Sequence, residues 1–228
     1  MSAPALLLLL VLGAVVGLDL VSVPQAMLSR PLVAGFLGGA VAGRPMAGLT
    51  IGALLELFAF ETLPIGAARY PDWGPAATAA GALAALRGGW DGTWMVGVMV
   101  VALVAAWLGG LSMHLARRLT ALEVKRREAA LEAGDPRALA ALQLGGMARD
   151  AARAALLTAF TFLVGERVAR AVEAGWRAPR PLADIAVIGT ALGVAAWSAW
   201  RLYGQRPTRR WLATGAVAAL ALLGIVAW

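Results

Sequence analysis

Long apolar runs, separated by short charged segments, dominate the chain. Residues 4–23 carry a single charge, at Asp19. A run of about twenty apolar residues is long enough, as a helix, to cross the hydrocarbon core of a bilayer. The run has no basic segment before it and no small-residue cleavage site followed by a soluble domain, which favours a retained helix over a signal peptide. Further apolar helices are predicted over 94–116, 151–165, 182–200 and 211–228.

Residues 31–63 show shorter apolar runs. Residues 31–43 end at Arg44-Pro45, and residues 46–60 contain Glu56 in their interior. Glycine and proline interrupt both runs, a pattern typical of discontinuous helices whose free backbone groups line a substrate site. Two thin or tilted helices in a glycine-packed bundle would show the same pattern, so both interpretations stay open. A third short segment of small residues follows at 76–86.

Charge is concentrated in the middle and at the end of the chain. Residues 117–137 contain six basic residues with mixed acids and predict a charged amphipathic helix, broken near Gly134-Asp135-Pro136. Residues 201–210 contain four arginines and no acid. Basic loops favour the cytoplasmic side of a membrane, so both segments are predicted to be cytoplasmic. Residues 166–181 are then predicted as an outer loop, although they also carry four arginines.

Composition narrows the class of protein. Of the 228 residues, 61% are hydrophobic and 14% are charged, whereas soluble domains average about 25% charged residues. This balance excludes an ordinary soluble enzyme or nucleic-acid-binding domain, although the net charge is +7. The predicted fold class is an all-α integral membrane protein. It is a multi-span helical bundle in one domain, 1–228, with broken hairpin helices in 1–93 and spanning helices in 94–228.

Several polar residues interrupt the apolar first half. An ionisable residue within a membrane segment is costly and therefore marks a candidate functional site. Carboxylates and amides suit a polyol, because a sugar hydroxyl both donates and accepts hydrogen bonds. Tyr70 or Trp73 would stack on a sugar ring. In the alternative interpretation, Arg30 and Arg69 simply form ion pairs with nearby acids. The polar residues are Asp19, Gln25, Ser29, Arg30, Glu56, Glu61, Arg69, Tyr70 and Asp72.

Other chemistries have little support in the sequence. There is no cysteine and only one histidine, His114, so disulfides, thiolate nucleophiles and multi-histidine metal sites are excluded. No P-loop, GxSxG or HExxH pattern is present. No cofactor, metal or catalytic residue is therefore expected in this chain.

Five short motifs resemble one family. The chain is similar to the IIC membrane component of the mannose/fructose/sorbose class of the phosphoenolpyruvate:sugar phosphotransferase system, most strongly over residues 10–85. The order of the later helices also fits. The motifs are Leu18-Asp19, SRPLVAG (29–35), GLTIGALLE (48–56), LPIGAA (63–68) and Pro71-Asp72.

The resemblance implies a sugar-translocating subunit in the bacterial cytoplasmic (inner) membrane. Such a subunit pairs with a IID membrane chain, assembles into trimers, and passes sugar to cytoplasmic IIB, which receives phosphate through IIA. The phosphorylated histidine lies on IIB, in keeping with the near absence of histidine here. By position, the sugar-binding residues implied are Glu56, Gly66, Ala67 and Asp72, together with Asp19 and Gln25.

Two positions depart from the family pattern. Mannose members often have histidine where this chain has Ser29, and asparagine where it has Pro64. Proline lacks both the side-chain amide and a backbone donor, so the motifs do not name the sugar. An alternative hypothesis follows: an orphan homologue that acts as a non-phosphorylating facilitator, a receptor or a scaffold subunit of another membrane complex.

Overall fold

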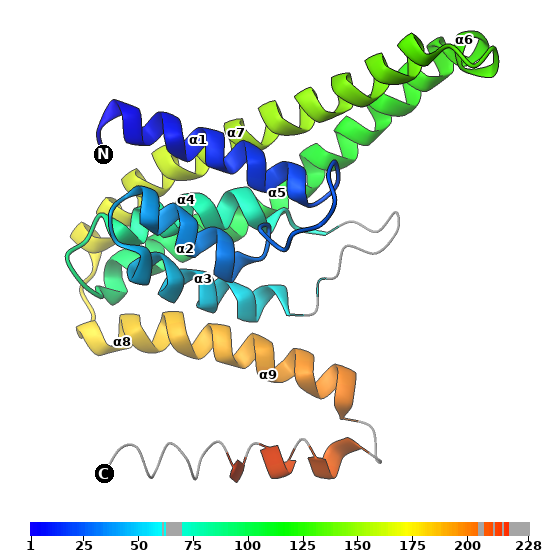
Figure 1. The fold of residues 1–228 in the computed structure, drawn as a ribbon. Coiled ribbons are helices and arrows are strands. Elements are labelled where there is room, and N and C mark those ends of the chain that lie inside the picture. Colours follow the sequence, from blue (N-terminus) through cyan, green and yellow to red (C-terminus); the bar gives the residue numbers. More distant parts are fainter. Residues whose placement is uncertain (61, 63–69, 205–207, 212, 216, 219–228) are drawn as a thin grey trace.

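The computed structural model describes residues 1–60, 62, 70–204, 208–211, 213–215 and 217–218. Across these ranges the regular elements are helices and no strand is present, which confirms the all-α prediction. Figure 1 shows their arrangement. The elements are α1 (Ala3–Asp19), α2 (Pro31–Val41), α3 (Pro45–Ala59), α4 (Trp73–Ala85), α5 (Gly92–Arg126), α6 (Glu128–Glu132), α7 (Pro136–Gly175), α8 (Arg180–Asp184), a π-helical turn η1 (Ile185–Gly189) and α9 (Thr190–Tyr203).

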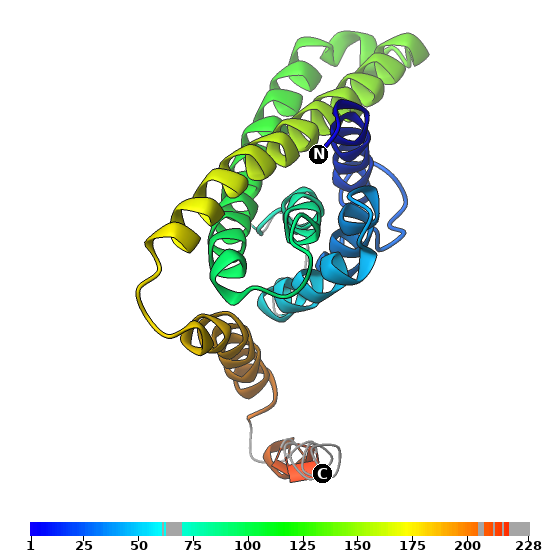
Figure 2. The same cartoon turned by 90° about the vertical axis from the view of Figure 1, so that its left-hand side faces the viewer.

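Helix α4 is the centre of the bundle. All 13 of its residues are buried, and Figure 2 shows it end-on inside a ring formed by α1, α2, α3, α5 and α7. Its sequence is mostly alanine and glycine. Because such side chains occupy little space, the surrounding backbones approach α4 closely.

Glycines form the contacts of the α2–α3 hairpin. Gly35 and Gly39 of α2 face Gly48 and Gly52 of α3, each pair spaced four residues apart. A Cβ atom on Gly48 would lie 2.2 Å from the carbonyl oxygen of Gly35. With 11 and 15 residues, these helices are about 16 and 22 Å long, so both are as short as the sequence predicts.

Local sequence signals fix where the helices begin. Pro31 and Pro45 occupy the first positions of α2 and α3, where a missing N–H leaves no intrahelical bond unmade. Asp91 caps α5 by accepting hydrogen bonds from the backbone N–H groups of Thr93 and Trp94. Burial opposes the charge on Asp91, but hydrogen bonds from the Thr93 hydroxyl and from these two N–H groups outweigh it and hold the pKa of its carboxyl below the usual value.

The charged middle of the chain corrects one prediction. Residues 117–137 do not form a separate amphipathic helix, because α5 continues unbroken to Arg126 and α7 begins at Pro136. The chain turns between them through α6, and Gly134 adopts a φ of 73° at the predicted break. Figure 1 shows α5 and α7 extending together beyond the bundle. We call this extension, residues 117–148, the arm.

The prediction of a loop over 166–181 is wrong for most of its length. Helix α7 runs through Gly175, leaving four residues before α8. The charged residues are compatible with a helix because they form pairs. Arg170 donates to Glu166 one turn away at 2.6 Å, and Glu173 forms an ion pair with Arg87, just after α4. The charges therefore lie along the surface of a continuous helix.

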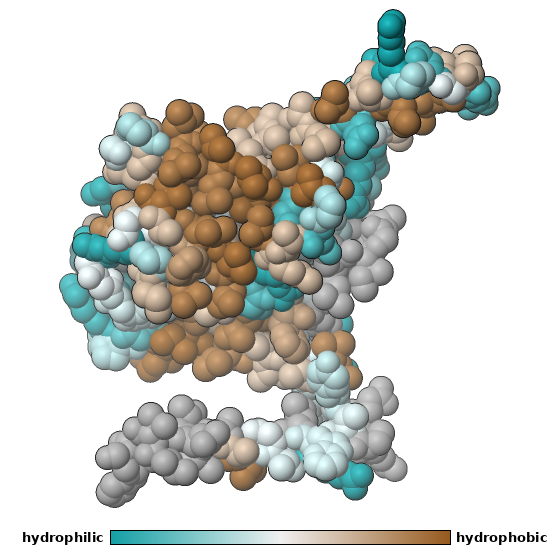
Figure 3. Space-filling view, viewed as in Figure 1, coloured by the Kyte–Doolittle hydropathy of each residue, from teal (hydrophilic) through white to brown (hydrophobic). Residues whose placement is uncertain are grey.

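Two of the described helices are long and apolar enough to cross a membrane. One is α5 (Gly92–Arg126), and the other is the continuous helix Arg180–Tyr203, which is made of α8, η1 and α9. Helix α1, with 17 residues, is about 26 Å long. Figure 3 shows an apolar surface over α1, α2 and α3, with polar residues at its edges and at the arm tip. The predicted helix 211–228 lies largely outside the described residues.

The close packing around α4 makes a testable prediction. A Cβ atom on Gly38 would lie 1.9 Å from the backbone carbonyl oxygen of Thr78. Gly38→Ala therefore forces α2 away from α4 and is expected to lower the free energy of unfolding by about 1–3 kcal/mol, measured by denaturant titration in detergent. The control is Gly145→Ala, because nothing lies within 4 Å of that position. Equal stability of the two variants would contradict this packing.

Candidate functional site

A pocket lies where several helices begin or end on one side of α4. Helix α1 ends and helices α2 and α4 begin around it, so the chain segments that line it are mostly loops. Its volume is about 140 Å³, close to the liquid volume of about five water molecules. The lining residues are Leu20, Gln25, Met27, Ser29, Arg30, Pro31, Thr62, Tyr70, Pro71 and Trp73.

Asp19 holds the loop that forms one wall of this pocket. The residue is 1% exposed, and its carboxylate accepts the backbone N–H groups of Ala26 at 2.6 Å and Ser29 at 2.9 Å. The Ser29 hydroxyl donates to the same carboxylate at 2.9 Å. Between these donors Met27 has a φ of 62°, a left-handed conformation unfavourable for a non-glycine residue. Asp19 therefore shapes the pocket wall from behind.

Glu56 does not line the pocket but forms an ion pair with Arg30, which does. It lies on α3 and accepts the backbone N–H of Leu32 at 3.1 Å. A carboxylate at this position satisfies a free donor at the start of α2 and complements the helix dipole. The Arg30–Glu56 pair is one that the ion-pair interpretation of the sequence included.

The remaining polar groups of the pocket come from separate segments. Gln25 is exposed and lines the pocket. The Thr62 hydroxyl accepts the indole N–H of Trp73 at 2.8 Å. The Tyr70 hydroxyl accepts a hydrogen bond from the Arg117 guanidinium at 2.7 Å, and that guanidinium also lies 5.5 Å from the centre of the Tyr70 ring.

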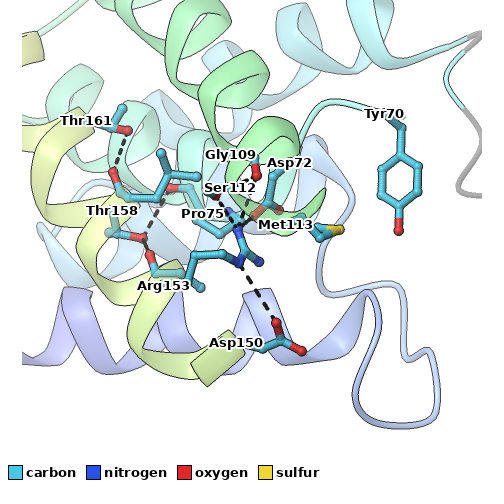
Figure 4. Close-up of polar contacts among 12 residues, drawn as sticks. Tyr70, Asp72, Pro75, Gly109, Ser112, Met113, Asp150, Arg153, Thr158 and Thr161 are labelled. Atoms are coloured by element: carbon cyan, nitrogen blue, oxygen red, sulfur yellow. Dashed lines mark hydrogen bonds and ion pairs between the residues drawn. The ribbon is translucent and has the colours of Figure 1, made fainter. Parts of the chain in front are cut away.

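Asp72 faces away from this pocket, toward α7. Its side chain is fully buried and accepts a hydrogen bond from Arg153 at 2.6 Å, as Figure 4 shows. Arg153 also lies 3.4 Å from the Ser112 hydroxyl on α5. The backbone N–H of Asp72 donates to the carbonyl oxygen of Ala106, about 21 Å along α5 from its start. The pair is thus deep in the bundle.

Of the six predicted binding residues, Asp19, Gln25, Glu56 and Asp72 are described. Only Gln25 among these four lines the pocket directly. Asp19 and Glu56 contact residues that line it, and Asp72 lies between the lining residues Pro71 and Trp73 with its carboxylate turned toward α7. The roles of all four stay predictions. Gly66 and Ala67, with Glu61, Pro64 and Arg69, lie outside the described residues.

The sequence patterns did not identify the residues that α7 contributes. Arg153 and Asp150 lie three residues apart, on one face of the helix, at the start of an apolar run. That charged pair next to apolar residues was the available signal. Asp72 and Ser22, to which they are hydrogen-bonded, lie 81 and 128 positions away in sequence, so the local pattern gave no indication of these contacts.

Comparisons with known proteins assign the sequence to a family. The family described as "PTS system sorbose-specific iic component" matches residues 4–196. No curated protein matches the chain.

Two solved structures are similar over the whole chain. One, described only as a membrane protein, has a TM-score of 0.75 and 20% identity and is covered over 93% of its length. The other is the mannose transporter ManYZ in complex with microcin E492, with a TM-score of 0.63, 21% identity and 92% of its chain covered. At these identities the likeness bears on the fold alone. Because the family match covers most of the sequence, the chain belongs to the sorbose-type IIC components of the phosphotransferase system, membrane proteins of sugar transport.

Proposed function

We propose that this chain is the sugar-translocating subunit of a phosphotransferase system in the bacterial cytoplasmic membrane. It binds one sugar in the pocket between the segments 20–30 and 70–73 and releases it to a cytoplasmic IIB protein for phosphorylation. A IID membrane chain and a trimeric assembly complete the transporter. The observation that carries this proposal is the pocket itself, which gathers polar groups and an aromatic ring at interrupted helices.

The chemistry of the pocket walls suits a single sugar. Gln25 offers both an amide donor and a carbonyl acceptor, and the guanidinium of Arg30 offers donors only. Hydroxyls of Thr62 and Tyr70 add further donors and acceptors. Trp73, largely buried with its indole N–H bound to Thr62, supplies an apolar ring for the apolar face of a sugar. A volume of about 140 Å³ favours one sugar ring over an oligosaccharide.

Charge on the arm supports the direction of release. Arg117 and Arg118 begin the arm, and Lys125, Arg126 and Arg127 lie near its tip. Basic segments stay on the cytoplasmic side of a membrane. The pocket lies at the end of the bundle from which the arm extends (Figure 1), because Tyr70 in its wall contacts Arg117. The pocket therefore opens toward the cytoplasm in this arrangement.

Helix lengths support a multi-span protein in which the N-terminal helices α2 and α3 do not cross the membrane completely. α5 and the continuous helix 180–203 are long enough to cross, and α7 returns antiparallel to α5. α2 and α3 fall short of the roughly 30 Å hydrocarbon core. Their ends therefore lie within the membrane, where free backbone groups are available to a ligand.

Gln25 tests the pocket directly. Gln25→Ala removes one donor and one acceptor and is expected to weaken sugar binding about tenfold, measured by calorimetry on the purified membrane complex with sorbose and with mannose. Gln143→Ala, an exposed glutamine on the arm, is the matched control. If Gln25→Ala binds like the wild type, the sugar does not lie in this pocket.

Glu56 tests the role of the Arg30 ion pair. Glu56→Gln removes the charge that orients Arg30, so sugar uptake in cells expressing the chain with its IID partner is expected to fall about tenfold. Asp72→Asn is expected to reduce uptake as well. Wild-type uptake and binding in both variants would rule out the assignment of the two carboxylates. Uptake without phosphorylation of the sugar would identify a facilitator instead.

The orientation is tested by thiol labelling in a chain that has no native cysteine. Arg127→Cys in the arm is expected to react with an impermeant maleimide only in inside-out vesicles. Gly89→Cys, at the opposite end of α4 and exposed, is expected to react only in right-side-out vesicles. The reverse pattern would place the pocket on the outer side.

A further inference from the structure

The two walls of the pocket come from segments far apart in sequence. One wall is the loop 20–30, which follows α1, and the other is the segment 70–73, which leads into α4. Neither wall has regular secondary structure outside the ends of helices. Their separation is therefore set by whatever fastens each of them to the bundle.

The loop wall is fastened to α7 through Ser22. The Ser22 hydroxyl donates to Asp150 Oδ2 at 2.7 Å, a contact between residues 128 positions apart. Asp19 holds the far part of the same loop from within, through Ala26 and Ser29. Ser22 therefore ties the near part of the loop to another helix of the bundle.

The second wall is fastened to α7 through Arg153. Its guanidinium donates to the carboxylate of Asp72, and Pro71 and Trp73 on either side of Asp72 line the pocket. Arg153 Nε lies 3.9 Å from Asp150 Oδ1, and Figure 4 shows the two side chains turned toward each other. Asp150 and Arg153 therefore join both walls at one turn of α7.

We propose that Asp150 and Arg153 are positioning residues that set the distance between the two walls of the pocket. The inference rests on the proposed sugar site, because it assigns these residues a role in that site. They act through Ser22 and Asp72 and do not line the pocket. The same helix continues into the arm, so a displacement of the arm reaches both walls through these two residues.

Burial indicates why this turn is suited to the role. The side chains of Asp150 and Arg153 are 18% and 11% exposed, so their contacts are shielded from water and ions. Arg149, one residue earlier than Asp150, is different. It pairs with Glu123 at 2.5 Å and contacts Thr120, both on the arm side of α5. Arg149 thus carries a charge on the same helix without a link to either wall.

The test uses the full chain in its membrane complex, with sorbose and mannose as probes. Ser22→Ala removes one hydroxyl at the surface of the loop and leaves the fold intact. It is expected to weaken sugar binding about three- to tenfold, the usual net effect of losing one hydrogen bond. Asp150→Ala is expected to weaken binding at least as much, and the double variant no further than Asp150→Ala alone.

Arg153 is tested with a variant that keeps its charge. Arg153→Gln would leave the buried carboxylate of Asp72 without a cation and could simply unfold the bundle. Arg153→Lys retains the positive charge. A lysine ammonium lacks the planar fork of donors with which arginine contacts Asp72 and Asp150 at the same time. Arg153→Lys is expected to weaken sugar binding by about as much as Asp150→Ala, and wild-type affinity in this variant would contradict the role given to Arg153.

A second readout follows the loop without sugar. Leu28 is partly buried against the core, so Leu28→Cys in this cysteine-free chain reacts slowly with maleimide while the loop is held. Labelling is expected to quicken about threefold or more in the Ser22→Ala and Asp150→Ala backgrounds, because each loses the same loop-fastening hydrogen bond. The Arg149→Gln background is the control and is expected to match the parent in both labelling and sugar affinity.

The outcomes separate this inference from the proposed function. If the wild type binds neither sugar but Leu28→Cys responds to Asp150→Ala and not to Arg149→Gln, the fastening holds and the sugar site fails. If the wild type binds sugar and Ser22→Ala and Asp150→Ala change neither affinity nor labelling, the inference is overturned. It is also overturned if Arg149→Gln weakens binding as much as Asp150→Ala.

Discussion

The ion pair between Asp72 and Arg153 is the contact around which the bundle is organised. A buried carboxylate is costly in an apolar interior unless hydrogen-bond donors or a cation lie beside it, and Asp72 has a cation. Arg153 supplies that charge from 81 positions away. The requirement fixes α7 beside the start of α4, and α5 closes the same region through Ser112 and Ala106. The enclosure of α4 by its neighbours follows from this pairing together with its small side chains.

Interrupted helices create both the pocket and the need for local compensation. Each helix that starts or stops inside the bundle leaves backbone N–H or C=O groups without intrahelical partners. Glu56 meets this need at the start of α2, and Asp19 meets it in the loop before α2. These carboxylates are therefore structural and site-forming at once. A sugar would find a pocket whose polar groups are already oriented, which lowers the entropy lost on binding.

The helices were predictable from the sequence where apolar length determines them. The short segments within 31–60 were placed correctly because glycine and proline set their limits. The prediction of a separate amphipathic helix over 117–137 was wrong because α5 runs on to Arg126, although the predicted break near Gly134 is present. The prediction of a loop over 166–181 was wrong because α7 carries its charges as pairs such as Arg170–Glu166 along a continuous surface. The candidate site was predictable only in part. The motifs pointed to Asp19, Gln25, Glu56 and Asp72, but the direction of each side chain and its partners on α7 depend on tertiary packing, which local pattern does not encode.

The Asp72–Arg153 pair also limits how α4 can move. Separating the two side chains while both stay buried costs about 3–5 kcal/mol, enough to make the separated state rarer than about one in a hundred. Any motion that carries the pocket therefore either takes α4 and α7 together or exchanges Arg153 for another partner of Asp72. The first alternative requires α5 to shift as well, because the Asp72 N–H is bound to Ala106. Since α5 and α7 both continue into the arm, the pocket and the arm then move as one body.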